Sequence, residues 1–231
     1  MRTNFASLLD LLRTIARLPI ARLDFQRAMD PANTERIYKH FTRRHPRFFI
    51  VGNKTLGVAL VNLRQFDNGA AYMATIKGSN SAEHHSRRAR ARGYRVVEID
   101  RNDYIDDIHH INTSVEMRQG QAMTHSYLDK QLHFVADPNY SYFGALDSAG
   151  RLVAYGEVGL WGNFAAFNRI IGIRNNDGIM HLLVSDIVCR YIDERKADYL
   201  MYDTYFGASP GLKLFKTALG FSPYRARYSL Q

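Results

Sequence analysis

The chain has 231 residues, of which 46% are hydrophobic and 23% are charged, so it can bury the core of one large globular domain. It contains no apolar run of about 18 residues, which predicts that no helix spans a membrane. The formal net charge of +9 favours an anionic partner, such as nucleic acid, a phosphate-rich cofactor or an acidic membrane surface, over a charge that serves solubility alone.

Cysteine and histidine usage argues against a metal centre. Cys189 is the single cysteine, so no intrachain disulfide and no thiolate cluster are expected, and a reducing cytoplasm is the predicted compartment. Cys189 follows two apolar residues and is interpreted as a core residue rather than a nucleophile. The histidine pairs His84-His85 and His109-His110 each point in different directions on a helix, so no metal is predicted.

Residues 1–82 are predicted to form an N-terminal extension that packs on the rest of the chain. Apolar residues recur at helical spacing between residues 8 and 15 and predict an amphipathic helix that ends before Pro19. This helix either packs on the protein or touches an acidic membrane surface. A turn or helix start at residues 30–33 and strand-rich segments at 48–63 and 70–76 follow, and no chemistry is assigned to them.

From residue 83 the hydrophobic periodicity gives a clearer order of elements. A basic helix at 83–92 precedes a strand at 94–99, a helix that begins near residue 102 and a short helix at 126–134. Three strands at 140–146, 152–160 and 164–173 are joined by tight turns, and a long amphipathic helix begins after Gly178. A strand at 199–206, a helix capped by Ser209 and a last strand at 221–230 complete the chain.

This order resembles that of the GNAT superfamily, in which a strand, two helices, an antiparallel meander and a long helix precede a strand, a helix and a closing strand. The helix that follows Ser209 ends in Leu-Gly-Phe, at residues 219–221, as in those enzymes. The Gly-Leu-x-x-Phe-Lys pattern at residues 211–216 resembles the Fem-type aminoacyltransferases, which are built from GNAT-like modules. For residues 83–231 the resemblance implies an α/β acyltransferase module with a mixed central sheet flanked by helices.

The resemblance also implies a site for coenzyme A. GNAT enzymes bind the cofactor pyrophosphate on amides of an Arg/Gln-x-x-Gly-x-Gly/Ala loop before the long helix. Here Arg174 replaces the second glycine and the loop is longer, and Asp177 is an unfavourable neighbour for phosphate unless it points away as the helix cap. Amides at a helix N-terminus still attract phosphate, so acyl-CoA is the expected donor, with a purely structural turn as the alternative. The expected cofactor-binding residues are Arg169, Gly172, Arg174, Asn175, Asn176, Gly178, Lys213 and Lys216.

Three residues are candidates for the catalytic chemistry. Glu157 lies among apolar and glycine residues of the middle strand of the meander, where a carboxylate that faces a cleft suits a general base; an exposed position on the strand is the alternative. Asp203, at the end of the strand 199–206, is a second base or an anchor for the amine, or else a structural cap. Tyr205 is a candidate acid for the leaving group, or a residue of the core or surface.

A basic run provides candidates for nucleic-acid contacts. Six arginines fall within the fifteen residues from 87 to 101. Those of the predicted helix, which are interleaved with alanine, would either pair with phosphate groups or form a solvated helix face. These four candidates are Arg87, Arg88, Arg90 and Arg92.

The sequence therefore predicts an N-acyltransferase that moves an acyl group from an activated donor, acyl-CoA, to a small-molecule or peptide amine. Direct attack in a ternary complex is expected, because no residue stands out as a covalent nucleophile. Transfer from an aminoacyl-tRNA, which the Fem-like segment and the charge of +9 favour, is the first alternative. A non-catalytic GNAT-like binding module is the second. The sequence gives no prediction of the oligomeric state.

Overall fold

The computed structural model describes residues 13–45, 52–78, 81–118, 121–122 and 125–231. One mixed sheet of eight strands, in the order β1-β10-β2-β9-β8-β7-β6-β3, runs through the molecule. Its strands are β1 (Ile20–Phe25), β2 (Leu56–Asn62), β3 (Arg95–Glu98), β6 (Tyr140–Leu146), β7 (Leu152–Leu160), β8 (Phe164–Gly172), β9 (Tyr199–Thr204) and β10 (Ser222–Leu230). A separate pair is formed by β4 (Met117–Arg118) and β5 (Gln121–Ala122).

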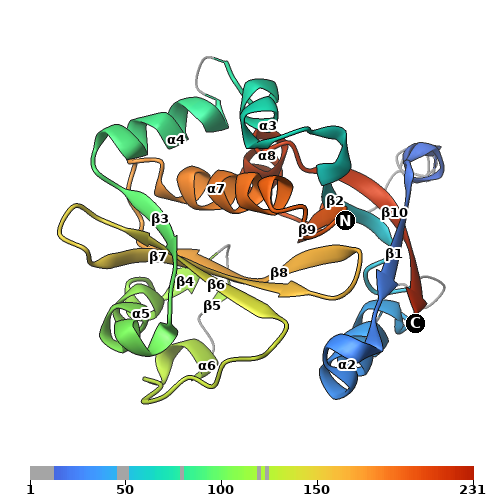
Figure 1. Ribbon diagram of the computed structural model, residues 1–231, viewed down its shortest axis with the longest axis horizontal. Coiled ribbons are helices and arrows are strands. Elements are labelled where there is room, and N and C mark those ends of the chain that lie inside the picture. The colour runs from blue at the N-terminus through green and yellow to red at the C-terminus, as the bar shows by residue number, and fades with distance from the viewer. Residues whose placement is uncertain (1–12, 46–51, 79–80, 119–120, 123–124) are drawn as a thin grey trace, which may run out of the picture.

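Helices cover both faces of this sheet (Figure 1). One face carries α3 (Gly69–Thr75), α4 (Ala82–Ala91), α7 (Ile179–Asp193) and α8 (Pro210–Ala218), and the other carries α2 (Pro31–Thr42), α5 (Ile105–Thr113) and α6 (His125–Leu128). The long helix α7 lies at the centre of the first face, because its apolar residues recur every three or four positions and nine of its side chains are buried. The fold is therefore the α/β arrangement that the sequence predicts.

The N-terminal third of the chain contributes two strands to the same sheet. β1 pairs in parallel with β10, and β2 lies between β10 and β9. Phe25 at the end of β1 packs edge-to-face on Tyr38 and Phe41 of α2 and on Phe164 of β8. The described residues of the N-terminal segment 1–82 therefore pack on the rest of the chain through β1, β2 and α2. The domain boundary at residue 82 stays a prediction.

Two local predictions differ from the structure. Residues 70–76 were expected to be a strand but form α3, because Tyr72 and Ile76 must reach the same core from positions four residues apart. The helix expected at 126–134 is only the single turn α6. Beyond it, the backbone of Phe134 exchanges hydrogen bonds with the Asn102 side chain instead of making helical ones. The apolar residues predicted to begin the N-terminal helix lie outside the described residues, and residues 13–17 are helical.

Candidate functional site

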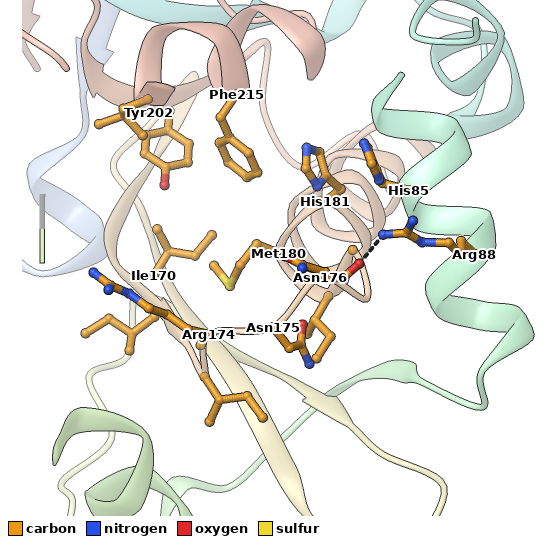
Figure 2. Close-up of a pocket in the computed structure, with 16 residues that line it drawn as sticks. His85, Arg88, Ile170, Arg174, Asn175, Asn176, Met180, His181, Tyr202 and Phe215 are labelled. Atoms are coloured by element: carbon orange, nitrogen blue, oxygen red, sulfur yellow. Dashed lines mark hydrogen bonds between the residues drawn. The ribbon is translucent and has the colours of Figure 1, made fainter. Parts of the chain in front are cut away.

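The two central strands β8 and β9 separate after a short parallel contact. They pair only where Phe164–Ala166 faces Tyr199–Met201, and their remaining residues diverge. A cavity of about 890 Å³ occupies this opening. It is lined by residues 170–176 of β8 and the following turn, by 178–181 at the start of α7, and by Tyr202, Leu212, Phe215, His85 and Arg88. Figure 2 shows these side chains converging on one space from β8, β9, α4, α7 and α8.

The start of α7 presents its first amide groups without a capping side chain. Its N-cap residue is Gly178, which has a left-handed backbone (φ 87°) and makes no side-chain hydrogen bond to the helix. A β-carbon at Gly178 would lie 2.4 Å from the carbonyl oxygen of His85, so glycine also permits the close approach of α4. The amides of the first turn therefore stay available to an anion at the edge of the cavity.

Asp177 is held away from this turn. Its carboxylate forms an ion pair with Arg92 and accepts a 2.9 Å hydrogen bond from the Tyr94 hydroxyl group. The helix cap is Gly178 rather than Asp177. The negative charge that counted against a phosphate site is thus neutralised on the side of α4.

The cavity wall formed by α4 and α7 is basic and aromatic. Arg88 donates to the carbonyl oxygen of Asn176 (Figure 2), and its Nε atom is buried without a hydrogen-bond partner among the described residues. His85 stacks on His181 at 4.6 Å between ring centroids, and His181 contacts Phe215. Burial, followed by the charges of His85 and Arg88, lowers the pKa of His181 to about 4, so His181 is neutral at physiological pH.

Tyr202 is a site residue that the sequence analysis did not select. Figure 2 shows its hydroxyl group pointing into the cavity, toward Ile170. Burial raises the pKa of Tyr202 above its ordinary value, so the phenol stays protonated and can donate a hydrogen bond into the cavity. Strand alternation places Tyr202 on the face of Leu200, but only the packing of α8 decides that this face borders a cavity.

The structure brings together five of the eight expected cofactor-binding residues. Gly172, Arg174, Asn175, Asn176 and Gly178 line the cavity. The other three, Arg169, Lys213 and Lys216, do not line it. The guanidinium of Arg169 lies over the Tyr127 ring at 4.3 Å, and Lys213 lies on α8, one turn before Lys216.

Lys216 lies on the buried side of α8, in contrast to its predicted role in binding the cofactor. It is 1% exposed, and its Nζ donates a 2.8 Å hydrogen bond to the Thr204 carbonyl oxygen. Burial lowers the pKa of Lys216 to about 8. The residue therefore ties α8 to the end of β9 and is not displayed toward the phosphate turn.

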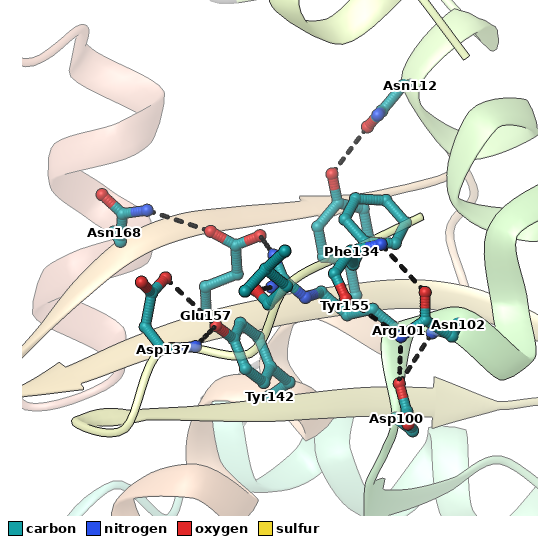
Figure 3. Close-up of polar contacts among 11 residues, drawn as sticks. Asp100, Arg101, Asn102, Asn112, Phe134, Asp137, Tyr142, Tyr155, Glu157 and Asn168 are labelled. Carbon is teal, nitrogen blue, oxygen red and sulfur yellow. Dashed lines mark hydrogen bonds and ion pairs between the residues drawn. The ribbon is translucent and has the colours of Figure 1, made fainter. Parts of the chain in front are cut away.

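Glu157 lies in a polar cluster on the opposite face of the sheet from α7 (Figure 3). It is 5% exposed, which excludes the alternative of an exposed residue on the strand. Its carboxylate accepts hydrogen bonds from Arg101 at 3.2 Å and from the Asn168 side chain at 2.9 Å. Arg101 is itself stacked on the Tyr142 ring at 3.8 Å. The cluster fixes the carboxylate beside β8, and in the register of β7 and β8 the backbone of Glu157 lies opposite that of Arg169.

The two other catalytic candidates lie apart from the large cavity. Asp203 has a left-handed backbone (φ 52°), is exposed and forms a 2.9 Å ion pair with Lys54. The hydroxyl group of Tyr205 is hydrogen-bonded at 2.8 Å to that of Thr217 on α8. Neither lines the opening between β8 and β9, so the three candidates do not converge on one point.

All four candidate arginines of α4 and its C-terminal cap make contacts within the protein. Arg90 pairs with Asp186 of α7, Arg92 pairs with Asp177, and Arg88 binds the Asn176 carbonyl oxygen. Arg87 pairs with Glu83 on its own helix and keeps 70% of its side chain exposed. Three of the four arginines thus fasten α4 to α7 and its preceding turn.

No group of three or more His, Cys, Asp and Glu side chains is placed to hold a metal ion within the described ranges. In the same part of the chain, no helix has the length and apolar character needed to cross a membrane.

The mixed sheet, its opening between β8 and β9 and the long helix that begins at this opening define a GNAT-like fold. No protein-family model matches the chain, and no curated protein matches it.

Solved structures share the fold at low sequence identity. The crystal structure of FemX aligns with a TM-score of 0.55 at 11% identity, covering 73% of this chain and 59% of that one. A conserved protein of unknown function from Bacteroides thetaiotaomicron aligns with a TM-score of 0.53 at 16% identity, covering 71% and 55%. The C-terminal domain (DUF2156) of a predicted lysylphosphatidylglycerol synthetase from Agrobacterium fabrum gives 0.50 at 14% identity, covering 72% and 57%. The chain thus spans less than two thirds of each.

Proposed function

We propose that the protein is an N-acyltransferase that transfers an acyl group from acyl-CoA to an amine. One observation carries the proposal: a cavity of about 890 Å³ fills the opening between β8 and β9, and the uncapped N-terminus of α7 borders it. The amides of the helix start would bind the pyrophosphate, with Arg174 at the rim. The apolar side chains of Ile170, Met180 and Phe215 would enclose the thioester arm.

The transfer requires no covalent enzyme intermediate. The amine nitrogen attacks the thioester carbonyl carbon, a carbon–nitrogen bond forms and the carbon–sulfur bond breaks. The proton lost by the amine passes to a general base, for which we propose Glu157, while the Tyr202 hydroxyl group donates a hydrogen bond to the departing thiolate, which takes its proton from water. Each oxygen of Glu157 accepts one hydrogen bond from the described residues and keeps a further lone pair for a proton.

The decisive experiment is a direct comparison of donors. Purified protein is titrated with coenzyme A and with charged tRNA in a calorimeter, and acyl transfer to a panel of amines is followed by mass spectrometry. Coenzyme A binding that is weakened in the Met180→Trp variant, whose larger side chain fills the cavity, is the expected result. Binding of neither compound would favour the non-catalytic module, and binding of charged tRNA alone would replace acyl-CoA as the donor.

An aminoacyl-tRNA donor is the second candidate. It is favoured by the Fem-like pattern at residues 211–216, by the fold shared with FemX and by the net charge of +9. Arg87, Arg90 and Arg92 all pair with carboxylates, but Arg87 is the one best displayed for a phosphate contact, because 70% of its side chain is exposed, against 50% for Arg90 and 49% for Arg92. Under this candidate, Arg87→Ala reduces the log–log salt slope of tRNA binding by about one. An unchanged slope would remove this helix from the contact surface.

A further inference from the structure

A second cavity lies beneath α2, on the opposite side of the sheet from the helix α7. It has a volume of about 240 Å³ and is formed between α2, the turn that carries Lys54, and the start of β8. Phe41 and Trp161, which are 5% and 2% exposed, form its apolar floor. The volume is below the roughly 300–1,000 Å³ typical of pockets for drug-sized ligands, so a small compound fits it.

The polar lining of this cavity is basic. Arg36, His40 and Lys54 contribute nitrogen atoms, and the lining contains no Asp or Glu among the described residues. Arg36 is hydrogen-bonded to the neutral side chain of Asn33, so this contact leaves its charge uncompensated. Lys54 shares its charge with Asp203 at 2.9 Å and lies over the Phe41 ring at 4.8 Å.

Two titratable groups of the lining, His40 and Tyr140, are uncharged at pH 7. Burial, followed by the charges of Lys54 and Arg43, lowers the pKa of His40 against a smaller opposing effect of Asp203, so His40 is neutral at pH 7. From the sheet, Tyr140 faces the cavity, and burial raises its pKa to about 12, so it is an uncharged donor. Among the described residues that line the cavity, Arg36 is therefore the main charge without a carboxylate partner.

Asn168 links this cavity to the polar cluster of Glu157. Its side chain lines the cavity and donates a 2.9 Å hydrogen bond to the Glu157 carboxylate (Figure 3). Residues 166–168 of β8 line the small cavity, and residues 170–172 of the same strand line the large one. The two cavities therefore flank one stretch of β8, with the position of Arg169 and its β7 neighbour Glu157 between them.

We infer that the cavity beneath α2 binds the acceptor, and that this acceptor is a small amine bearing an anionic group, a carboxylate or a phosphate. The role of this cavity as an acceptor site rests on the proposed acyl transfer. Its preference for an anionic ligand rests on the cavity alone. Arg36 and Lys54 bind the anionic group, and the apolar floor contacts the carbon skeleton. The amine is thereby directed toward Asn168 and Glu157, across β8 from the donor.

The test is calorimetric binding of three probes: O-phosphoethanolamine, β-alanine and ethanolamine. The first two carry the phosphate and the carboxylate, and ethanolamine lacks an anionic group. At least one anionic probe is expected to bind, with ethanolamine at least tenfold weaker. Arg36→Gln and Lys54→Gln should each weaken binding of the anionic probe by about tenfold. Lys39→Gln, at an exposed position on the same helix as Arg36, should not weaken it.

Coenzyme A binding is measured in the same variants, so that the two proposals fail separately. If the wild-type protein does not bind coenzyme A, the proposal of acyl-CoA as the donor is contradicted, whereas the proposal of an anion site is unaffected. Absence of binding by both anionic probes, or equal binding in Arg36→Gln and the wild-type protein, would overturn the inference. A short RNA oligonucleotide that binds through Arg36 where neither small anion does would also overturn it.

Discussion

The side-chain amide of Asn168 donates a 2.9 Å hydrogen bond to Glu157, while Arg101 approaches the other carboxylate oxygen at 3.2 Å. This pair of contacts fixes a buried carboxylate at the side of β8, the strand that lines both cavities. The two contacts give the Glu157 carboxylate a fixed orientation. Asp203, by contrast, is exposed and forms an ion pair with Lys54.

Replacement of Glu157 by Gln should therefore lower turnover far more than replacement of Asp203 by Asn. A general base contributes about 10² to 10⁴ in rate, so Glu157→Gln is expected to lose turnover in that range while coenzyme A affinity stays within twofold. The measurements are kcat, donor affinity by calorimetry and the melting temperature, which shows whether the variant is folded. Near-normal turnover of both variants would exclude both carboxylates as the base.

Gly178→Ala should destabilise the protein more than Gly150→Ala. Both glycines have a left-handed backbone, with φ of 87° and 83°, so each alanine carries a similar conformational cost of roughly 1–2 kcal/mol. At Gly178 the new methyl group would also meet the His85 carbonyl oxygen at 2.4 Å, whereas nothing lies within 4 Å of it at Gly150. The free energy of unfolding, from urea titration, should differ by a further 1–3 kcal/mol or so. Equal losses would mean that α4 shifts freely.

Arg174→Glu should weaken coenzyme A binding at least tenfold, or by about 1.4 kcal/mol. The side chain is exposed at the rim of the cavity, and reversal of its charge would repel the pyrophosphate. Arg227→Glu, an exposed substitution of the same kind on β10, is the control for net charge. Calorimetry that gives the same affinity for both variants would remove this turn from the donor site.

Stability should fall as the pH drops from about 6.5 to 4 because of His181. Its pKa is 6.5 in the unfolded chain and about 4 in the folded protein, so the unfolded state binds more protons in this window. The free energy of unfolding therefore rises with pH there, by roughly 3 kcal/mol at most from this residue. Urea titrations at pH 4.5 and 7 should show a smaller difference for His181→Gln than for the wild-type protein, and no such reduction for His125→Gln. An unchanged difference would contradict a buried neutral histidine.

Local signals in the sequence determined much of the fold. The helix begun by Ser209 and Pro210, the three-strand meander and the long helix α7 lie where periodicity and turn residues predict them. These features depend on backbone conformations and capping groups within a few residues of one another. The order of the elements was enough to predict a GNAT-like sheet.

Only the tertiary structure decided which side chains share a site. The alternation of Ala21, Leu23 and Phe25 is visible in the sequence, but its partner strand β10 lies about 200 residues away. Lys216 appeared suited to a phosphate, yet the orientation of α8 buries it against Thr204. Propensity acts along the chain, whereas burial and charge pairing depend on which surfaces meet in space. The sequence therefore determined the elements, and the packing of α2, α4 and α8 on the sheet determined the two cavities and what lines them.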